Sequence, residues 1–112
     1  MTNCSVPDAI FQALANPTRR AVFERLCGGP ATVSALAEPF DMALPSFMQH
    51  LGVLEEAGLV RSYKRGRVRT LEARETPILV LGTWLDEQRS LWERRLDQLD
   101  DYLETTFRGD AG

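Results

Sequence analysis

The spacing of the apolar residues changes at Gly58, and this change constrains the fold more than any other feature of the sequence. Before Gly58, apolar residues recur every three or four positions, as they do along one face of a helix. Over residues 59–72 the pattern becomes that of two strands, with a turn at Gly66-Arg67. Helical spacing resumes at Thr76 or Pro77 and continues to about Phe107. The sequence therefore predicts a mainly α fold with one small β-hairpin.

Residues that start and stop helices divide the first part of the chain into four short helices. Asn16 and Pro17 mark one start, because Asn caps helices and Pro favours the first helical position. Thr32 is expected to cap another helix, and Gly58 is expected just beyond the fourth, where glycine is the usual residue. The four helices are predicted over about 7–15, 18–26, 33–38 and 45–57.

Short helices followed by a β-ribbon form the layout of a winged helix-turn-helix domain. In this layout the second helix of the helix-turn-helix, the recognition helix, enters the major groove of DNA, and the hairpin is called the wing. We predict the helix-turn-helix at about 32–57, a two-stranded wing at about 59–72 and a long C-terminal dimerisation helix at about 76–107. Together these elements make five helices and one wing in a single domain over residues 1–112.

The recognition helix can be divided into two faces at about 100° per residue. Four apolar residues converge on the face that is expected to meet the core, namely Leu44, Phe47, Leu51 and Leu54. Gln49 is the residue most opposed to them, and its amide can bond the N6/N7 edge of adenine. His50 stands at the margin, where it contacts the DNA backbone or packs. The residues of this helix expected to contact DNA are Pro45, Ser46, Gln49 and His50, and a solvated surface is the alternative.

A short basic segment interrupts an otherwise acidic chain. The 112 residues carry a net charge of −3, whereas residues 61–74 contain six basic residues and one acidic residue. Nucleic acid is the usual partner of such a segment, because each phosphate that pairs with Lys or Arg releases condensed counterions. A solvated basic hairpin without a ligand is the alternative. The wing residues expected to grip phosphates or to enter the minor groove are Lys64, Arg65, Arg67 and Arg69.

Several short motifs, in this order and spacing, resemble the ArsR/SmtB family of transcriptional repressors. They are Leu14-Ala15-Asn16-Pro17-Thr18-Arg19-Arg20, Leu36-Ala37-Glu38, Gln49-His50-Leu51, Val53-Leu54-Glu55-Glu56-Ala57-Gly58-Leu59-Val60, and Gly66-Arg67 with Arg69. The resemblance covers about residues 8–107 and implies a homodimeric repressor that binds an inverted-repeat operator. Trp84 and Trp92, followed by Arg94-Arg95-Leu96-Asp97-Gln98-Leu99, are similar to a branch of the family whose members generally lack the metal ligands.

The recognition helix departs from the family pattern. Many relatives have Ser where this sequence has Met48 and a basic residue where it has Leu44 and Gly52. The resemblance therefore implies a groove face that is unusually apolar. Leu44, Met48 and Val53 are candidates for contact with thymine methyl groups, the alternative being an operator of a different kind.

The resemblance also directs attention to two metal sites of the family. The first is a Cys-x-Cys pair before the recognition helix, and Thr32 and Ser34 occupy those positions. The second uses Asp and His ligands on the last helix, which here has carboxylates but no histidine. We therefore expect no bound metal or cofactor, and the sequence identifies no effector. Cys4 and Cys27 keep open a thiol- or As(III)-responsive repressor, although a cysteine is more often small apolar filling.

The last helix is too long for the domain that it belongs to. As a helix, residues 77–107 extend about 45 Å, whereas a domain of this size has a radius of about 13 Å. Its apolar stripe is therefore expected to pack in a homodimer rather than on its own core. The alternative is an interaction module that binds a different partner and has lost DNA binding. The expected interface residues are Ile78, Leu81, Trp84, Leu85, Leu91, Trp92, Leu96 and Leu99.

Other classes of protein lack support in the sequence. No run of about 18 apolar residues is present, and the start of the chain lacks the basic and apolar parts of an export signal. Two cysteines are too few for a disulfide framework, so a cytoplasmic location is expected. No activated nucleophile, acid–base pair or glycine-rich phosphate loop is evident, so an enzyme is not expected.

Overall fold

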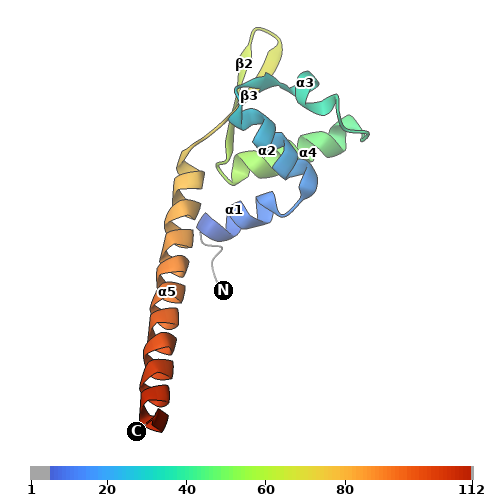
Figure 1. Ribbon diagram of the computed structural model, residues 1–112. Coiled ribbons are helices and arrows are strands. Elements are labelled where there is room, and N and C mark those ends of the chain that lie inside the picture. Colours follow the sequence, from blue (N-terminus) through green and yellow to red (C-terminus); the bar gives the residue numbers. More distant parts are fainter. Residues whose placement is uncertain (1–5, 112) are drawn as a thin grey trace, which may run out of the picture. The chain divides into compact units, whose positions relative to one another are not determined.

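The computed structural model describes the backbone of residues 6–111 and the side chains of residues 7–106. The described chain divides into two compact units, one ending at Leu81 and the other beginning at Gly82. The elements in chain order are α1 (Val6–Leu14), α2 (Pro17–Cys27), β1 (Ala31–Thr32), α3 (Val33–Ala37), α4 (Leu44–Glu56), β2 (Val60–Arg65), β3 (Val68–Ala73) and α5 (Thr76–Ala111) (Figure 1). The first unit is thus four short helices, a sheet and the first residues of α5.

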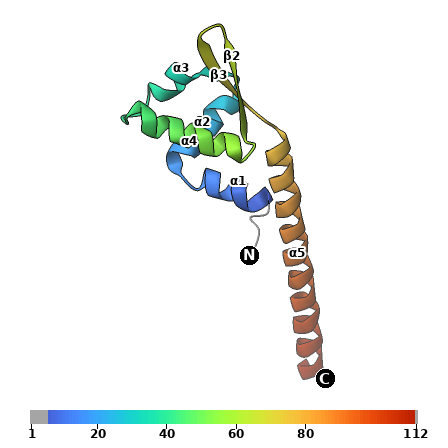
Figure 2. The ribbon, with the colours of Figure 1, turned by 180° about the vertical axis from the view of Figure 1, so that it is seen from behind.

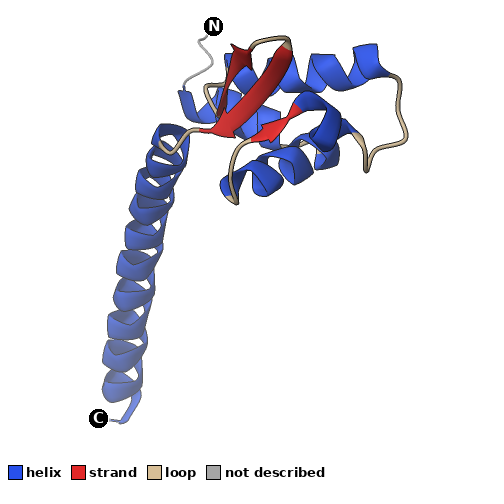
Figure 3. Ribbon diagram, turned by 90° about the horizontal axis from the view of Figure 1, so that it is seen from above, coloured by secondary structure: helices blue, strands red, loops and turns tan. Residues whose placement is uncertain are grey.

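The sheet has three strands rather than the two that we predicted. Its order is β1-β3-β2, and both pairings are antiparallel (Figure 3). The additional strand, β1, has only two residues, and Ala31 pairs with Leu71. Two residues cannot display an alternating pattern, and the partner lies 40 residues away along the chain, so the sequence carries no local signal for this strand.

The residues expected to start and stop helices do so. The Asn16 Oδ1 atom accepts the backbone N–H of Arg19 at 3.1 Å, and the Thr32 Oγ1 atom accepts that of Ala35 at 3.1 Å. Gly58 follows the C-cap of α4 with a φ of +77°, a left-handed conformation that glycine adopts without steric cost. The N–H of Leu59 then bonds the carbonyl of Leu54 at 3.0 Å, which reverses the chain tightly into β2.

The core of the first unit lies where α2 packs against α1, α4 and β3 (Figures 1 and 2). Phe47, Leu51 and Leu54 of α4 are buried in it, as their spacing predicted. Leu44 is not, because 57% of this residue is exposed, and the prediction that it faces the core is wrong. Leu44 is the first residue of α4, and at that end the ring of Phe40 covers the core, with its centroid 5.5 Å from that of Phe47.

Helix α5 begins as predicted and ends at Ala111, four residues beyond the predicted end. Most of its large apolar side chains in the second unit are exposed in the single chain, including Trp92 at 63% and Leu85 at 55%. Over the described residues, the apolar stretches of the helices are too short or too charged for any helix to cross a membrane.

Candidate nucleic-acid interface

Helix α4 presents an exposed face that carries no charge over its first two turns. Burial of Phe47, Leu51 and Leu54 fixes the rotation of the helix about its axis. Pro45, Ser46 and Gln49 are consequently exposed on the opposite side. Met48, at the margin of that side, and Leu44, the first residue of the helix, are exposed as well. Helix α4 contains neither Lys nor Arg, so the amide of Gln49 is its main polar group for hydrogen bonding outward.

His50 is half-buried and is held by a residue of another helix. The Nη1 atom of Arg19 on α2 lies 3.2 Å from the Nδ1 atom of His50. A guanidinium can only donate, so this contact is a hydrogen bond in the tautomer whose Nδ1 atom accepts and whose Nε2 atom carries the proton. His50 can therefore donate from Nε2 to an acceptor such as a phosphate oxygen.

Arg19 also joins α1 to this pair. Its Nε atom donates to the carbonyl of Ala13 at 2.7 Å, and its Nη2 atom donates to the carbonyl of Gln12 at 3.0 Å. These carbonyls belong to the last turn of α1, where the helix itself supplies few donors, and that of Gln12 also accepts the backbone N–H of Ala15 at 3.3 Å. One guanidinium thus connects α1, α2 and α4, a role that sequence reasoning did not assign to Arg19.

The wing is a tight hairpin with a basic tip. Gly66 has a φ of +64° while Arg67 does not have a positive φ, which fits a type II′ turn. Lys64 lies directly opposite Arg69 in the register of the two strands. Like charges in such positions oppose pairing of the strands, and they are favourable when the hairpin faces a polyanion.

The basic residues of the wing differ in their contacts. The Nε atom of Arg61 donates to Glu72 at 2.8 Å, so its charge is compensated within the sheet. Arg69 donates to the hydroxyl of Ser62 at 3.0 Å. In contrast, Lys64, Arg65 and Arg67 are exposed and have no ion pair or side-chain hydrogen bond to other described residues. These three cations are free to bind an external anion.

A short chain of hydrogen bonds joins the wing to the end of α4. The hydroxyl of Ser62 on β2 donates to the Oε1 atom of Glu55 at 2.7 Å, while it accepts the hydrogen bond from Arg69. Side-chain hydrogen bonds therefore connect the wing to the C-terminal end of α4. Sequence reasoning missed this link, since Ser62 and Glu55 carry no motif of their own.

The residues at the positions of the Cys-x-Cys site have other roles. The hydroxyl of Thr32 caps α3, and Ser34 is exposed. Across the part of the chain that the structure describes, no three His, Cys, Asp or Glu side chains are grouped so as to hold a metal ion. The absence of a bound metal stays a prediction.

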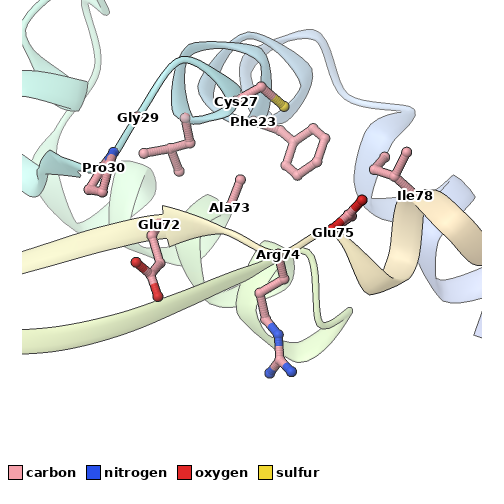
Figure 4. A pocket seen from close by; sticks show the side chains of 10 residues that line it. Phe23, Cys27, Gly29, Pro30, Glu72, Ala73, Arg74, Glu75 and Ile78 are labelled. Atoms are coloured by element: carbon pink, nitrogen blue, oxygen red, sulfur yellow. The ribbon is translucent and has the colours of Figure 1, made fainter.

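Cys27 is exposed at the end of α2, so it does not fill the core, and Cys4 lies outside the described residues. Cys27 lines a pocket of about 420 Å³ together with Phe23, Ala73 and Ile78. Figure 4 shows Phe23 and Cys27 on one side of this pocket and the guanidinium of Arg74 pointing away from them.

Comparison with known proteins relates this chain to transcription regulators. The family model described as a helix-turn-helix domain matches residues 14–63. The HTH-type transcriptional regulator Rv2034 of Mycobacterium tuberculosis is 40% identical over 96 residues, which cover 86% of this chain and 87% of that protein. The transcriptional repressor SdpR of Bacillus subtilis is 34% identical over 58 residues, covering 52% of this chain and 64% of SdpR.

Solved structures agree with these sequence relatives. The crystal structure of an ArsR family transcriptional regulator is 57% identical, with a TM-score of 0.77, over 80% of this chain and 98% of that one. An ArsR-like transcriptional regulator from Rhodococcus sp. RHA1 is 26% identical, with a TM-score of 0.73, over 84% of this chain and 89% of that one. The predicted winged helix-turn-helix fold is thereby confirmed.

Proposed function

Because the chain belongs to the ArsR family of helix-turn-helix transcriptional regulators, we propose that it represses transcription by binding an inverted-repeat DNA operator as a homodimer. Membership confirms the family resemblance of the sequence motifs and makes the chain a transcription regulator with a DNA-binding helix-turn-helix. Repression, the operator and the homodimer are the proposed part. Repression is in keeping with the similarity to the repressor SdpR.

The observation that supports DNA binding best is the combination of an uncharged exposed face on α4 with free cations on the wing. Lys64, Arg65 and Arg67 are not compensated by other described residues. Like charges at the tip of the wing destabilise the pairing of its strands. A protein-interaction module without DNA binding would gain nothing that offsets this loss of stability. We therefore favour DNA over a protein partner for this surface.

The proposed contacts follow from chemistry and exposure. Gln49 reads a base edge in the major groove. Pro45 and Ser46 are exposed in the first turn of α4, the end that enters the groove, and contact the DNA backbone or the bases. The Nε2–H group of His50 donates to a phosphate. Lys64, Arg65 and Arg67 neutralise phosphates, and Arg69 contributes from a position restrained by Ser62. Two recognition helices in the dimer enter major grooves about 34 Å apart.

Salt dependence tests the electrostatic part of this proposal. If a dimer neutralises about eight phosphates, log K falls with log[salt] at a slope of about −7. Binding to an operator obtained by selection from random DNA is measured by fluorescence anisotropy at several salt concentrations. Arg67→Ala is expected to weaken all sequences alike, whereas Gln49→Ala relaxes the preference at one or two base pairs by about 1–3 kcal/mol. A flat salt response, or selection of no preferred sequence, would refute DNA recognition by this surface.

The apolar stripe of α5 supports the homodimer. Ile78, Leu85, Trp92 and Leu99 are seven residues apart, which is close to two helical turns, and all are exposed in the single chain. The other expected interface residues, Trp84, Leu91 and Leu96, are exposed as well, while Leu81 packs partly against the core of its own chain. Obligate dimers bury upwards of about 2,000 Å² of accessible surface, in interfaces that are more apolar than those of transient complexes.

Paired substitutions on opposite sides of α5 test the dimer. Leu85→Asp with Trp92→Asp places two carboxylates in the proposed interface, where burial costs several kcal/mol, so the dimer is expected to dissociate. Thr83→Asp with Ser90→Asp adds the same charges, seven residues apart, on the opposite side of the helix and is the matched control. Analytical ultracentrifugation measures the mass of both variants. A stable dimer for the first variant, with unchanged operator affinity, would place the interface elsewhere.

A further inference from the structure

We propose that α4 reads the methyl groups of thymine through Leu44 and Met48, so that each operator half-site carries A·T pairs beneath this helix. The inference rests on the proposed function and specifies the class of DNA sequence that the interface selects. It concerns base recognition alone and requires no effector.

The first observation is the exposure of two large apolar side chains on the outer surface of α4. Leu44 is 57% exposed and Met48 is 38% exposed, although the chain has a core that accepts other residues of the same helix. They are four residues apart, so they are neighbours along one side of the helix. Leu44 belongs neither to the buried core nor to the partly buried residues that pack against it, whereas Phe40 packs against Phe47 in that core.

The second observation is the lack of groups that read guanine. The commonest specific contact to guanine is a bidentate Arg or Lys at O6 and N7, and α4 has neither residue. Gln49, next to Met48 in the sequence, offers the amide that suits the N6/N7 edge of adenine. An apolar contact with the C5 methyl group and an amide at the adenine edge are two common ways to recognise an A·T pair in the major groove.

Glu55 and Glu56, the only acidic residues of α4, stand at the C-terminal end of the helix. Glu55 accepts the hydrogen bond from Ser62, so it is engaged with the wing. The first two turns of α4 therefore meet the groove with apolar atoms, the amide of Gln49 and the hydroxyl of Ser46. A hydroxyl can bond any of the bases, so this set favours pairs with a methyl group over G·C pairs.

Deoxyuridine provides the test, because it pairs as thymine does and lacks only the methyl group. In an operator obtained by selection, each thymine of one half-site is replaced in turn, and affinity is measured by anisotropy. We expect one or two thymines at which the replacement weakens binding about fourfold, the value for one buried methyl group. Replacing the symmetry-related thymine as well is expected to weaken binding about 16-fold in total.

The variants Leu44→Ala and Met48→Ala identify the side chains. Both residues are exposed, so both variants are expected to fold with unchanged thermal stability. For each variant, two operators that differ only by thymine or deoxyuridine at the position contacted by the missing side chain should bind with equal affinity. Gln49→Ala is the matched control on the same helix, and it should keep the discrimination between thymine and deoxyuridine while losing the preference for adenine.

The outcomes separate this inference from the proposed function. Specific binding that is unaffected by deoxyuridine at every position, or selected half-sites without thymine under α4, overturns the methyl readout and leaves DNA binding intact. Failure to select any sequence overturns the proposed function itself. Discrimination that persists in both Leu44→Ala and Met48→Ala also overturns the inference, since other residues would then contact the methyl groups.

Discussion

Replacing Arg19 is expected to affect both the stability of the domain and its affinity for DNA. Its guanidinium bonds the carbonyls of Ala13 and Gln12 at the end of α1 and the Nδ1 atom of His50 on α4. A hydrogen bond to a charged group contributes about 1.5–3 kcal/mol when well formed. These three are partly open to water, so Arg19→Ala is expected to lower the free energy of unfolding by about 2–3 kcal/mol. For a domain of this size that corresponds to a loss of roughly 10 °C in Tm.

Arg20 supplies the matched control. Its Nη1 atom donates to the carbonyls of Leu14 and Ala15 at 2.9 and 3.2 Å, so it also binds the end of α1, but it does not reach α4. Both bonds are exposed, and Arg20→Ala is expected to cost about 1 kcal/mol. The contact with His50 is what distinguishes the two arginines.

The assay combines denaturation with a double-mutant cycle. Arg19→Ala, His50→Ala and the double variant are unfolded in urea at one fixed protein concentration, since assembly and stability are linked. The coupling energy between the two residues is expected to be about 0.5–1 kcal/mol. Below the transition temperature, Arg19→Ala should weaken operator binding about fivefold, the value of one hydrogen bond, because the Nε2–H group of His50 is no longer oriented. Arg20→Ala should leave operator binding unchanged.

Two results would contradict this reasoning. Equal destabilisation by Arg19→Ala and Arg20→Ala would mean that the contact with His50 contributes nothing. Strict additivity of Arg19→Ala and His50→Ala, together with unchanged operator affinity, would remove Arg19 as a positioning residue for the recognition helix.

Three further predictions concern the turn after α4, the link to the wing and the response to metals. Gly58→Ala is expected to lower the free energy of unfolding by about 1–2 kcal/mol, because φ is +77° there and the cost is backbone strain alone, with no atom of the described residues within 4 Å of an added Cβ. Gly52→Ala, inside α4 and equally open, is expected to raise the free energy of unfolding by about 0.5–1 kcal/mol. Urea denaturation that showed a change of the same sign for both variants would refute this prediction. Ser62→Ala removes the hydrogen bonds that link Glu55 to Arg69. It is expected to weaken operator binding about threefold to tenfold, the value of one or two hydrogen bonds, with little change in Tm. Unchanged affinity, measured by anisotropy, would show that the link does not position the wing. Stoichiometric Zn²⁺, Ni²⁺ or Cu⁺ is expected to leave operator affinity unchanged, because Thr32 and Ser34 stand where the zinc- and arsenic-type members of the family have thiolates. Release of DNA by one equivalent of metal would disprove this prediction. Release by As(III) alone that is lost in Cys27→Ser or Cys4→Ser would support the thiol alternative.

The sequence alone was sufficient for the elements whose signals are local. Asn16, Thr32 and Gly58 act within one turn of themselves, so their caps and the limits of α2, α3 and α4 were predictable to within about a residue or two. The hairpin was equally accessible, because Gly66 supplies the one positive φ that its turn requires. The burial of Phe47, Leu51 and Leu54 followed from helical spacing, and with it the exposure of Gln49.

Only the tertiary structure decided what depends on residues far apart in the chain. Strand β1 exists because Ala31 and Thr32 meet β3 about 40 residues later. Leu44 is exposed, whereas spacing on an isolated helix assigned it to the buried side, and Phe40 from the preceding loop packs against Phe47 in the core. The partners of the polar side chains were equally non-local: Arg19 reaches His50 across 31 residues, and Ser62 joins α4 to β3. Side-chain spacing specifies which face of an element is buried, but which surface covers that face, and which polar group bonds which, is determined only when the elements pack together.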